Sequence, residues 1–140
     1  EIPIGFKIPA LPGAEQVITK VTPRSIMEKT VKGIYGNPEQ VTAAGVDQFM
    51  DIMRREGNRK ALFDRRKADQ GLGSEAIKNI IQPTLIIWGD QDRLIPAGDA
   101  HKFGEDIQNA EVIVYENIGH VPMMEIPERS ASDVRQFLMK

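Results

Sequence analysis

The stretch "TLIIWGDQDRLIP" (residues 84–96) joins a continuous apolar run to a polar turn. The run from Thr84 to Gly89 is rich in β-branched side chains, which is typical of a strand buried on both faces of a sheet. Two acidic residues, Asp90 and Asp92, follow the run directly. We therefore expect a buried strand whose carboxyl end leads into an acidic loop.

A helix, a second strand and a second helix follow this stretch. "AGDAHKFGEDI" (residues 97–107) has a helical pattern, and "EVIVYE" (residues 111–116) is another short apolar run. "PERSASDVRQFLMK" (residues 127–140) is typical of an amphipathic helix with a proline in its first turn. A strand, a crossover helix, a strand and a helix in this order predict a right-handed parallel α/β unit.

The first 80 residues have a different character. Residues 1–15 are rich in proline and glycine, which predicts an irregular N-terminal segment. Helical patterns then cover residues 21–36, 41–57, 58–70 and 74–80. Four residues can cap these helices: Thr22, Thr42, Asn58 and Ser74. We therefore expect a helical region over residues 1–80 and an α/β region over residues 81–140.

The composition argues against several classes of protein. The net charge of −2 gives no global reason to expect nucleic acid as a partner, and no apolar run is long enough to span a membrane. There are no cysteines, which excludes disulfides and thiolate metal sites. The first residues lack the pattern of a signal peptide, and we expect a cytoplasmic protein. No spacing of His101 and His120 with acidic residues indicates a metal site, and no cofactor is expected.

The polar residues that could carry chemistry follow the two expected strands. Catalytic groups gather beyond the carboxyl ends of strands in an open α/β sheet. Asp90 and Asp92 follow the first strand, and His120 follows the second within "NIGHVPMMEIPE" (residues 117–128). A carboxylate bonded to one imidazole nitrogen fixes the tautomer and stabilises the imidazolium that forms when the other nitrogen takes a proton. By position, either aspartate can be this partner of His120. The alternative for Asp92 and His120 is that each is an ordinary loop residue.

Together, "PTLIIWGDQDRLIP" and "VIVYENIGHVPMMEIPE" resemble the C-terminal third of an α/β-hydrolase. Seven residues fit the two loops of that family: Gly89, Asp92 and Pro96 in the acid loop, and Gly119, His120, Glu125 and Pro127 in the histidine loop. The resemblance implies the C-terminal portion of an α/β-hydrolase sheet, two parallel strands with flanking helices, preceded by a helical cap or lid over residues 1–80. It also implies that Asp92 and His120 are the acid and the histidine of a catalytic triad. We therefore expect Asp90 to be a turn or capping group.

The nucleophile of that family is missing from the sequence. It sits in a Gly-x-Ser-x-Gly turn, and no such pattern occurs here. The four serines lie at helix starts or on helix surfaces: Ser25, Ser74, Ser130 and Ser132. We therefore expect a fragment of a hydrolase whose serine lies outside this chain, and we expect the chain alone to be inactive.

The resemblance implies a carboxylic ester or a similar small apolar compound as the substrate. Met123 and Met124 adjoin His120 and are the candidates for its pocket. Epoxide hydrolases, haloalkane dehalogenases and carbon–carbon bond hydrolases share the same loops, and the first two use an aspartate nucleophile, so these reactions stay open. A different class also stays open, namely a stand-alone, non-catalytic α/β interaction module that keeps relic loops.

The expected sheet also predicts a partner. Two strands alone form a marginal sheet, and the run 84–89 is apolar enough to need neighbours on both sides. An unpaired strand edge offers backbone groups to any chain that can pair with it. We therefore expect self-association or pairing with the missing N-terminal half.

Overall fold

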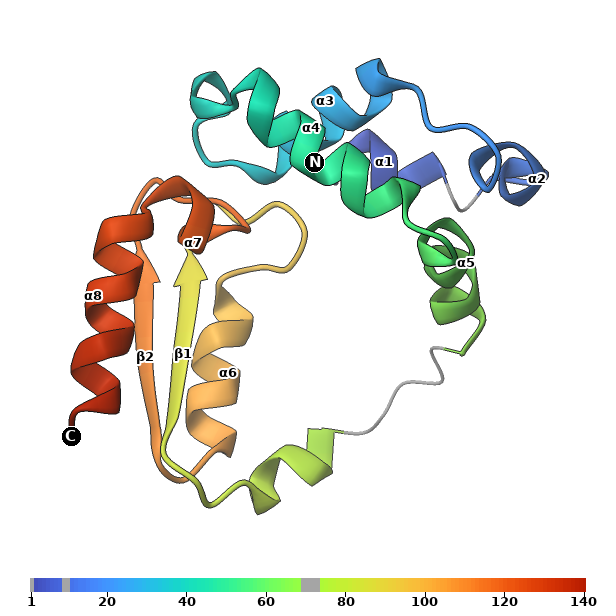
Figure 1. The fold of residues 1–140 in the computed structure, drawn as a ribbon. Helices are drawn as coiled ribbons and strands as arrows, with labels where there is room; N and C mark the ends of the chain where they lie inside the picture. Colours follow the sequence, from blue (N-terminus) through green and yellow to red (C-terminus); the bar gives the residue numbers. More distant parts are fainter. Residues whose placement is uncertain (1, 9–10, 69–73) are drawn as a thin grey trace. The chain divides into compact units, whose positions relative to one another are not determined.

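The computed structural model describes residues 2–8, 11–68 and 74–140 (Figure 1). These form two compact units, one from Glu1–Gly33 with Pro38–Leu72 and one from Ile34–Asn37 with Gly73–Lys140. The 3-10 helix η3 (Ser74–Asn79) groups with the second unit, together with residues 34–37. No described helix has the length and apolar character that crossing a membrane requires.

The second unit is built on a two-stranded parallel sheet. Strand β1 (Thr84–Gly89) pairs with β2 (Ala110–Tyr115) along their whole lengths, from Thr84 opposite Ala110 to Gly89 opposite Tyr115. The helix α6 (Gly98–Asp106) connects them, and α7 (Pro122–Glu125) and α8 (Pro127–Leu138) follow β2 (Figure 1). The expected order of strand, helix, strand and helix is confirmed. The four-residue helix α7 was not expected.

The two faces of this sheet pack against different helices. Successive strand residues point to opposite faces. On one face, Ile86 packs with Ala100 and Ile107 in a buried cluster that Trp88 and Phe103 extend. A Cβ atom on Gly104 of α6 would lie 2.6 Å from Val112 Cγ2, so the helix approaches the sheet closely. This cluster fixes the strand that carries the acid loop.

On the opposite face, β2 is tied to α8 through a tyrosine. Tyr115 is fully buried, and its hydroxyl donates to Asp133 Oδ2 at 2.7 Å. The Arg129 guanidinium lies 4.9 Å from the centre of its ring. Burial, and then the hydrogen bond to Asp133, raise the pKa of Tyr115 to about 12. The hydroxyl therefore stays a hydrogen-bond donor at neutral pH, which holds the helix that follows the histidine loop.

The described part of the first unit is helical. It contains α1 (Ile4–Lys7), α2 (Ala14–Ile18), α3 (Arg24–Ile34), η2 (Pro38–Gln40), α4 (Ala43–Arg54) and α5 (Asn58–Ala68). The prediction of an irregular N-terminal segment is wrong in part, because α1 and the start of α2 lie in it. The carbonyl groups of Thr19 and Lys20, just after α2, accept hydrogen bonds from Arg59 Nη1 on α5. A partner 40 residues away supports this short helix, and local sequence does not show it.

The expected helix caps have different outcomes. The Thr42 hydroxyl accepts a hydrogen bond from the Gly45 N–H at 3.0 Å, as a capping residue should. Thr22 does not cap, since its buried Oγ1 has no hydrogen-bond partner among the described residues. Asn58 also does not cap; it lies inside α5, and its side-chain amide donates to the Ile52 carbonyl oxygen. The Ser74 side chain, and the last two residues of the expected helix 58–70, lie outside the described part.

Candidate active site

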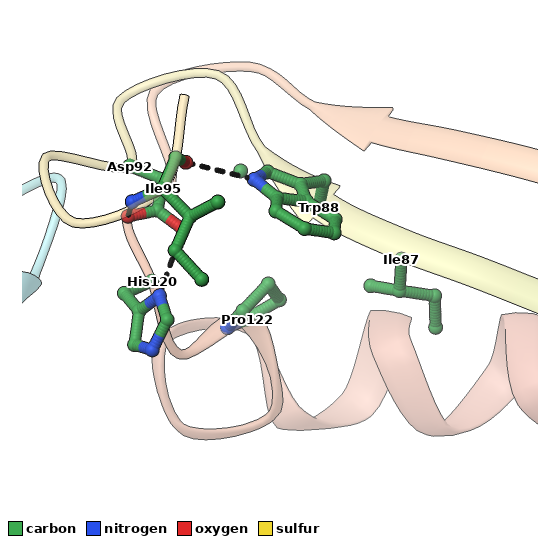
Figure 2. Close-up of a pocket in the computed structure, with 7 residues that line it drawn as sticks. Ile87, Trp88, Asp92, Ile95, His120 and Pro122 are labelled. Atoms are coloured by element: carbon green, nitrogen blue, oxygen red, sulfur yellow. Dashed lines mark hydrogen bonds and ion pairs between the residues drawn. The ribbon is translucent and has the colours of Figure 1, made fainter. Parts of the chain in front are cut away.

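The acid loop after β1 holds Asp92 in one orientation. Its side chain is only 3% exposed. Asp92 Oδ1 accepts the backbone N–H groups of Leu94 and Ile95 at 2.7 and 3.0 Å, which closes the turn on the carboxylate. The indole of Trp88, at the end of β1, donates to the Ile95 carbonyl oxygen at 3.1 Å (Figure 2). The strand and its own loop therefore fix one carboxylate oxygen and leave the other for a partner.

That partner is the imidazole of His120. Asp92 Oδ2 lies 2.8 Å from His120 Nδ1 (Figure 2). An ionised carboxylate only accepts hydrogen bonds, so the proton in this contact belongs to Nδ1, and Nε2 of the neutral ring is an acceptor. The His120 side chain is 33% exposed, and none of the described residues forms a hydrogen bond with its Nε2. The ring can therefore take a proton from a group that arrives from outside.

The structure brings Asp92, and not Asp90, to His120. Asp90 Oδ1 accepts the backbone N–H of Asn117 at 2.7 Å, and Asn117 has the left-handed φ of 62°. The N–H of Gln91 donates to the Ile118 carbonyl oxygen at 2.8 Å. Asp90 therefore joins the acid loop to the histidine loop, as a turn residue would.

The two loops touch through glycine backbone. A Cβ atom on Gly89 would overlap the carbonyl oxygens of Ile118 and Gly119. Only glycine allows backbone to approach this closely. Gly89 thus lets the histidine loop lie directly on the end of β1, and this contact sets the distance between Asp92 and His120.

His120 lines two concave sites in the second unit. A cavity of about 110 Å³ is lined by Ile87, Trp88, Gly89, Asp92, Ile95, His120 and Pro122 (Figure 2). A wider depression of about 690 Å³ lies between His120 and α8 and has mainly apolar walls. Met123 lines this depression and is 63% exposed, whereas Met124 is half-buried and does not line it. Of the two methionine candidates, the structure therefore sets Met123 beside the histidine in this depression.

The other candidate groups of the described residues form no hydrogen bond with Asp92 or His120. His101 is exposed on α6, and the described residues contain no group of three His, Asp or Glu side chains that could hold a metal ion. The hydroxyl of Ser130 donates to the Pro127 carbonyl oxygen. Within the described part of the chain, no serine is hydrogen-bonded to His120. The arrangement can hold and move a proton but contains no paired nucleophile.

Sequence reasoning missed one contributor to the site. Glu125 was noted only as part of the loop pattern, yet its buried carboxylate accepts the backbone N–H groups of Gly119 and Gly36. The backbone N–H of His120 donates to the Ile34 carbonyl oxygen at 2.7 Å. Nothing in the local sequence indicates that residues 34–36 support the histidine loop.

Comparisons with known proteins find lipases and another hydrolase among the relatives of this chain. The relatives in sequence include Lipase 3 of Moraxella sp. (strain TA144), 40% identical over 55 residues, which cover 39% of this chain and 18% of that protein. Monoacylglycerol lipase abhd6-B of Xenopus laevis is 35% identical over 104 residues, which cover 72% of this chain and 30% of that protein. A solved structure of a serine hydrolase involved in carbazole degradation (CarC enzyme) matches with a TM-score of 0.75 and 25% identity. The match covers 84% of this chain and 47% of that one.

The chain thus spans less than half of each of these proteins. The family model described as the alpha/beta hydrolase fold matches residues 21–127, which is most of the chain. With the parallel sheet and the likeness to solved hydrolases, this match shows that the chain belongs to the α/β hydrolase fold family.

Proposed function

We propose that this chain supplies the acid and the histidine of a Ser-His-Asp triad in a capped hydrolase, and that the serine comes from a segment outside these 140 residues. The observation that carries the proposal is the contact of 2.8 Å between Asp92 Oδ2 and His120 Nδ1, with Nε2 left without a partner among the described residues. The sequence contains no Gly-x-Ser-x-Gly pattern, which is why the serine is placed elsewhere.

The proposed chemistry gives the two ring nitrogens of His120 different roles. Nδ1–H donates to Asp92, so Nε2 can take the proton from the serine hydroxyl as its oxygen attacks the ester carbonyl carbon. Asp92 stabilises the imidazolium that results. Nε2–H then gives the proton to the departing alcohol, and an acyl-enzyme remains. Water, deprotonated by the same nitrogen, then attacks the acyl carbon. The bond from that carbon to the serine oxygen breaks, the serine oxygen takes the proton from Nε2–H, and the carboxylic acid is released.

The proposed substrate is a carboxylic ester with an apolar acyl group. Relatives at 35–41% identity are named lipases, which supports ester cleavage. The depression beside His120 has mainly apolar walls, which suits an acyl chain. Met123, which lines this depression, is proposed to contact that chain, whereas Met124 does not line it. The helical region of residues 1–80 is proposed to be the lid that selects the substrate.

A second reaction within the same class has one observation in its favour. The solved serine hydrolase at 25% identity is described as involved in carbazole degradation. The same acid and histidine could serve cleavage of a carbon–carbon bond next to a carbonyl in an aromatic breakdown product. Steady-state kinetics on a short-chain p-nitrophenyl ester and on a ring-cleavage dienoate would rank the two substrates.

The proposal is tested on the complete product of the gene that encodes this chain. We expect ester hydrolysis from that product, and we expect His120→Ala to lower kcat by at least about 10,000-fold, because the triad acts as a unit. His101→Ala is the matched control and should leave kcat unchanged, because that histidine is exposed on α6.

The isolated 140-residue chain should show no turnover above free imidazole, since the nucleophile and the oxyanion donors carry most of the rate. Equal activity of the His120→Ala product and the unaltered product would exclude the proposed role. Turnover by the isolated chain that depends on one of its own serines would also exclude it. A gene product that ends at these 140 residues and lacks activity would favour the non-catalytic module.

A further inference from the structure

Glu125 is a buried carboxylate whose place in the proposed mechanism is open. It ends α7 and is 9% exposed. Its Oε1 accepts the Gly119 N–H at 2.9 Å, and its Oε2 accepts the Gly36 N–H at 2.8 Å. No lysine or arginine among the described residues forms an ion pair with it. The two backbone N–H groups therefore supply the hydrogen bonds that a buried charge requires.

Glu125 joins residues 34–36 to the histidine loop, and these two segments are also in direct contact. The backbone N–H of His120 donates to the Ile34 carbonyl oxygen at 2.7 Å. A Cβ atom on Gly119 would lie 2.7 Å from the carbonyl carbon of Tyr35, and one on Gly36 would lie 2.9 Å from the Gly119 nitrogen. There is no room for a side chain on either glycine, so the two stretches of backbone pack against each other.

The charge of Glu125 also acts on a tyrosine at this contact. Tyr35, between Ile34 and Gly36, is 6% exposed. Burial raises the pKa of Tyr35, and the negative charge of Glu125 raises it further. The carboxylate thus lies close to the middle of segment 34–36 as well as to the residue before His120.

We infer that Glu125 is a positioning residue for His120. The inference rests on the proposed role of His120 as the proton carrier. The Gly36 N–H, the Glu125 carboxylate and the Gly119 N–H form one bracket, here called the Glu125 bracket, which holds the backbone directly before the histidine. The Ile34 carbonyl oxygen accepts a hydrogen bond from the backbone N–H of His120, and Asp92 accepts one from Nδ1 of the ring. Without the bracket the loop can turn, and the imidazole then leaves the plane and distance in which Asp92 binds Nδ1.

A purely structural role would predict lower stability and nothing else, so the test must report on the imidazole itself. The chain has two histidines, and exposed His101 serves as an internal reference for His120. Nitrogen-15 NMR of the ring nitrogens reports which nitrogen carries the proton. In the unaltered chain we expect His120 to carry it on Nδ1, with a low-field proton signal, and His101 to show the mixture of tautomers of a solvated ring.

Glu125→Gln is the variant that tests the bracket. The amide has the shape of the carboxylate but only one oxygen, so its NH₂ group meets one of the two backbone N–H groups, donor against donor. We expect His120 to lose the low-field signal and to shift toward the tautomer mixture of His101. Tyr115→Phe is the matched control, because it removes the hydrogen bond to Asp133 and leaves the bracket in place. It should lower stability and leave the ring signals of both histidines unchanged.

A folded Glu125→Gln chain whose His120 keeps the proton on Nδ1 with the unaltered low-field signal would overturn the inference. Amide exchange of the unaltered chain gives a second measurement that needs no variant. The N–H groups of Gly36, Gly119 and His120 should exchange slowly and at one shared rate, because they open together. A Gly36 N–H that exchanges as fast as that of exposed Gly98 would also overturn it.

Kinetics of the complete gene product separate this inference from the proposed function. If both hold, Glu125→Gln lowers kcat by about 10- to 100-fold, the scale of a misplacement near 1 Å, and leaves KM unchanged. If His120→Ala has no effect on kcat, the proposed function fails while the NMR result still decides on the bracket. If His120→Ala abolishes turnover and Glu125→Gln leaves kcat unchanged, the proposed function stands and the positioning role is wrong.

Discussion

The two carboxylate oxygens of Asp92 bind different partners. Oδ1 closes the turn by accepting the N–H groups of Leu94 and Ile95, and Oδ2 faces His120 Nδ1. Asp90, two residues earlier, accepts the N–H of Asn117 instead. The side chain that the turn orients toward the histidine is therefore the second aspartate, and the first one fastens the loops together.

This division gives a prediction for Asp92→Asn in the complete gene product. The amide oxygen should keep the two backbone hydrogen bonds, which turns the NH₂ group toward His120. A donor facing Nδ1 moves the ring proton to Nε2, and the ring can no longer take a proton from the nucleophile. We expect kcat to fall by about 10,000-fold with the fold retained, as steady-state kinetics and circular dichroism would measure.

Asp90→Asn is the matched control for that variant. Its amide oxygen can still accept the Asn117 N–H, so kcat should stay close to that of the unaltered protein. A larger loss of kcat in Asp90→Asn than in Asp92→Asn would reverse the assignment of the acid.

The sequence predicted the parts of the site that follow recognisable strands, but not the contacts between residues that are far apart in the sequence. Asp92 and His120 each follow a recognisable strand, so the edge on which they meet could be expected from the topology alone. The support from Gly36 could not, because its N–H reaches Glu125 across 89 residues of sequence. A glycine at the end of a helical pattern indicates a helix end, and nothing local distinguishes it from one that packs under a histidine loop.

At the scale of elements, length decided which predictions succeeded. β1 and β2 are six residues each, and α4, α5 and α8 have 11 or 12, which is enough for an apolar period to show. The helices that were missed, α1, α2 and α7, have four or five residues. A helix of about one turn is too short to show an apolar period. In addition, α2 is supported by a hydrogen bond from the distant residue Arg59 to the chain just after the helix.

Thr42 and Thr22 give a matched test of helix capping. The Thr42 hydroxyl accepts the Gly45 N–H, whereas the buried Thr22 hydroxyl has no partner among the described residues. Thr42→Val should lower the free energy of unfolding by about 1 kcal/mol, because valine cannot cap. Thr22→Val should leave it unchanged or raise it, because it removes a buried hydroxyl without a hydrogen bond. Urea unfolding followed by circular dichroism would measure both, and equal losses would contradict this account of the two helix starts.

For the whole molecule, the sheet is the feature that demands a partner. Among the described residues β1 pairs only with β2, and its other edge carries no strand. Apolar side chains on the same unit are exposed, including Ile81 at 67% and Leu138 at 74%. Val134 lines the depression that Ile87 of β1 also lines. A sheet of two strands with this exposed surface is marginal without further cover.

We therefore predict that the isolated chain self-associates through this face of the sheet. Light scattering should show a mass that rises with concentration, and Val134→Lys should shift the chain toward monomer. Val17→Lys is the control, because Val17 is 62% exposed and belongs to the first unit, whereas the sheet belongs to the second. A monodisperse monomer at high concentration, with slow amide exchange along β1, would instead show that the fragment is self-sufficient and would favour the non-catalytic module.

The central claim is that Asp92 and His120 activate a serine that this chain does not contain, and labelling of that serine tests it most directly. The complete gene product would be treated with a fluorophosphonate, which reacts with activated serines, and the labelled peptide would be identified by mass spectrometry. We predict one labelled serine outside residues 1–140, with labelling lost in His120→Ala and kept in His101→Ala. Labelling of Ser25, Ser74, Ser130 or Ser132, or labelling that does not depend on His120, would contradict the account.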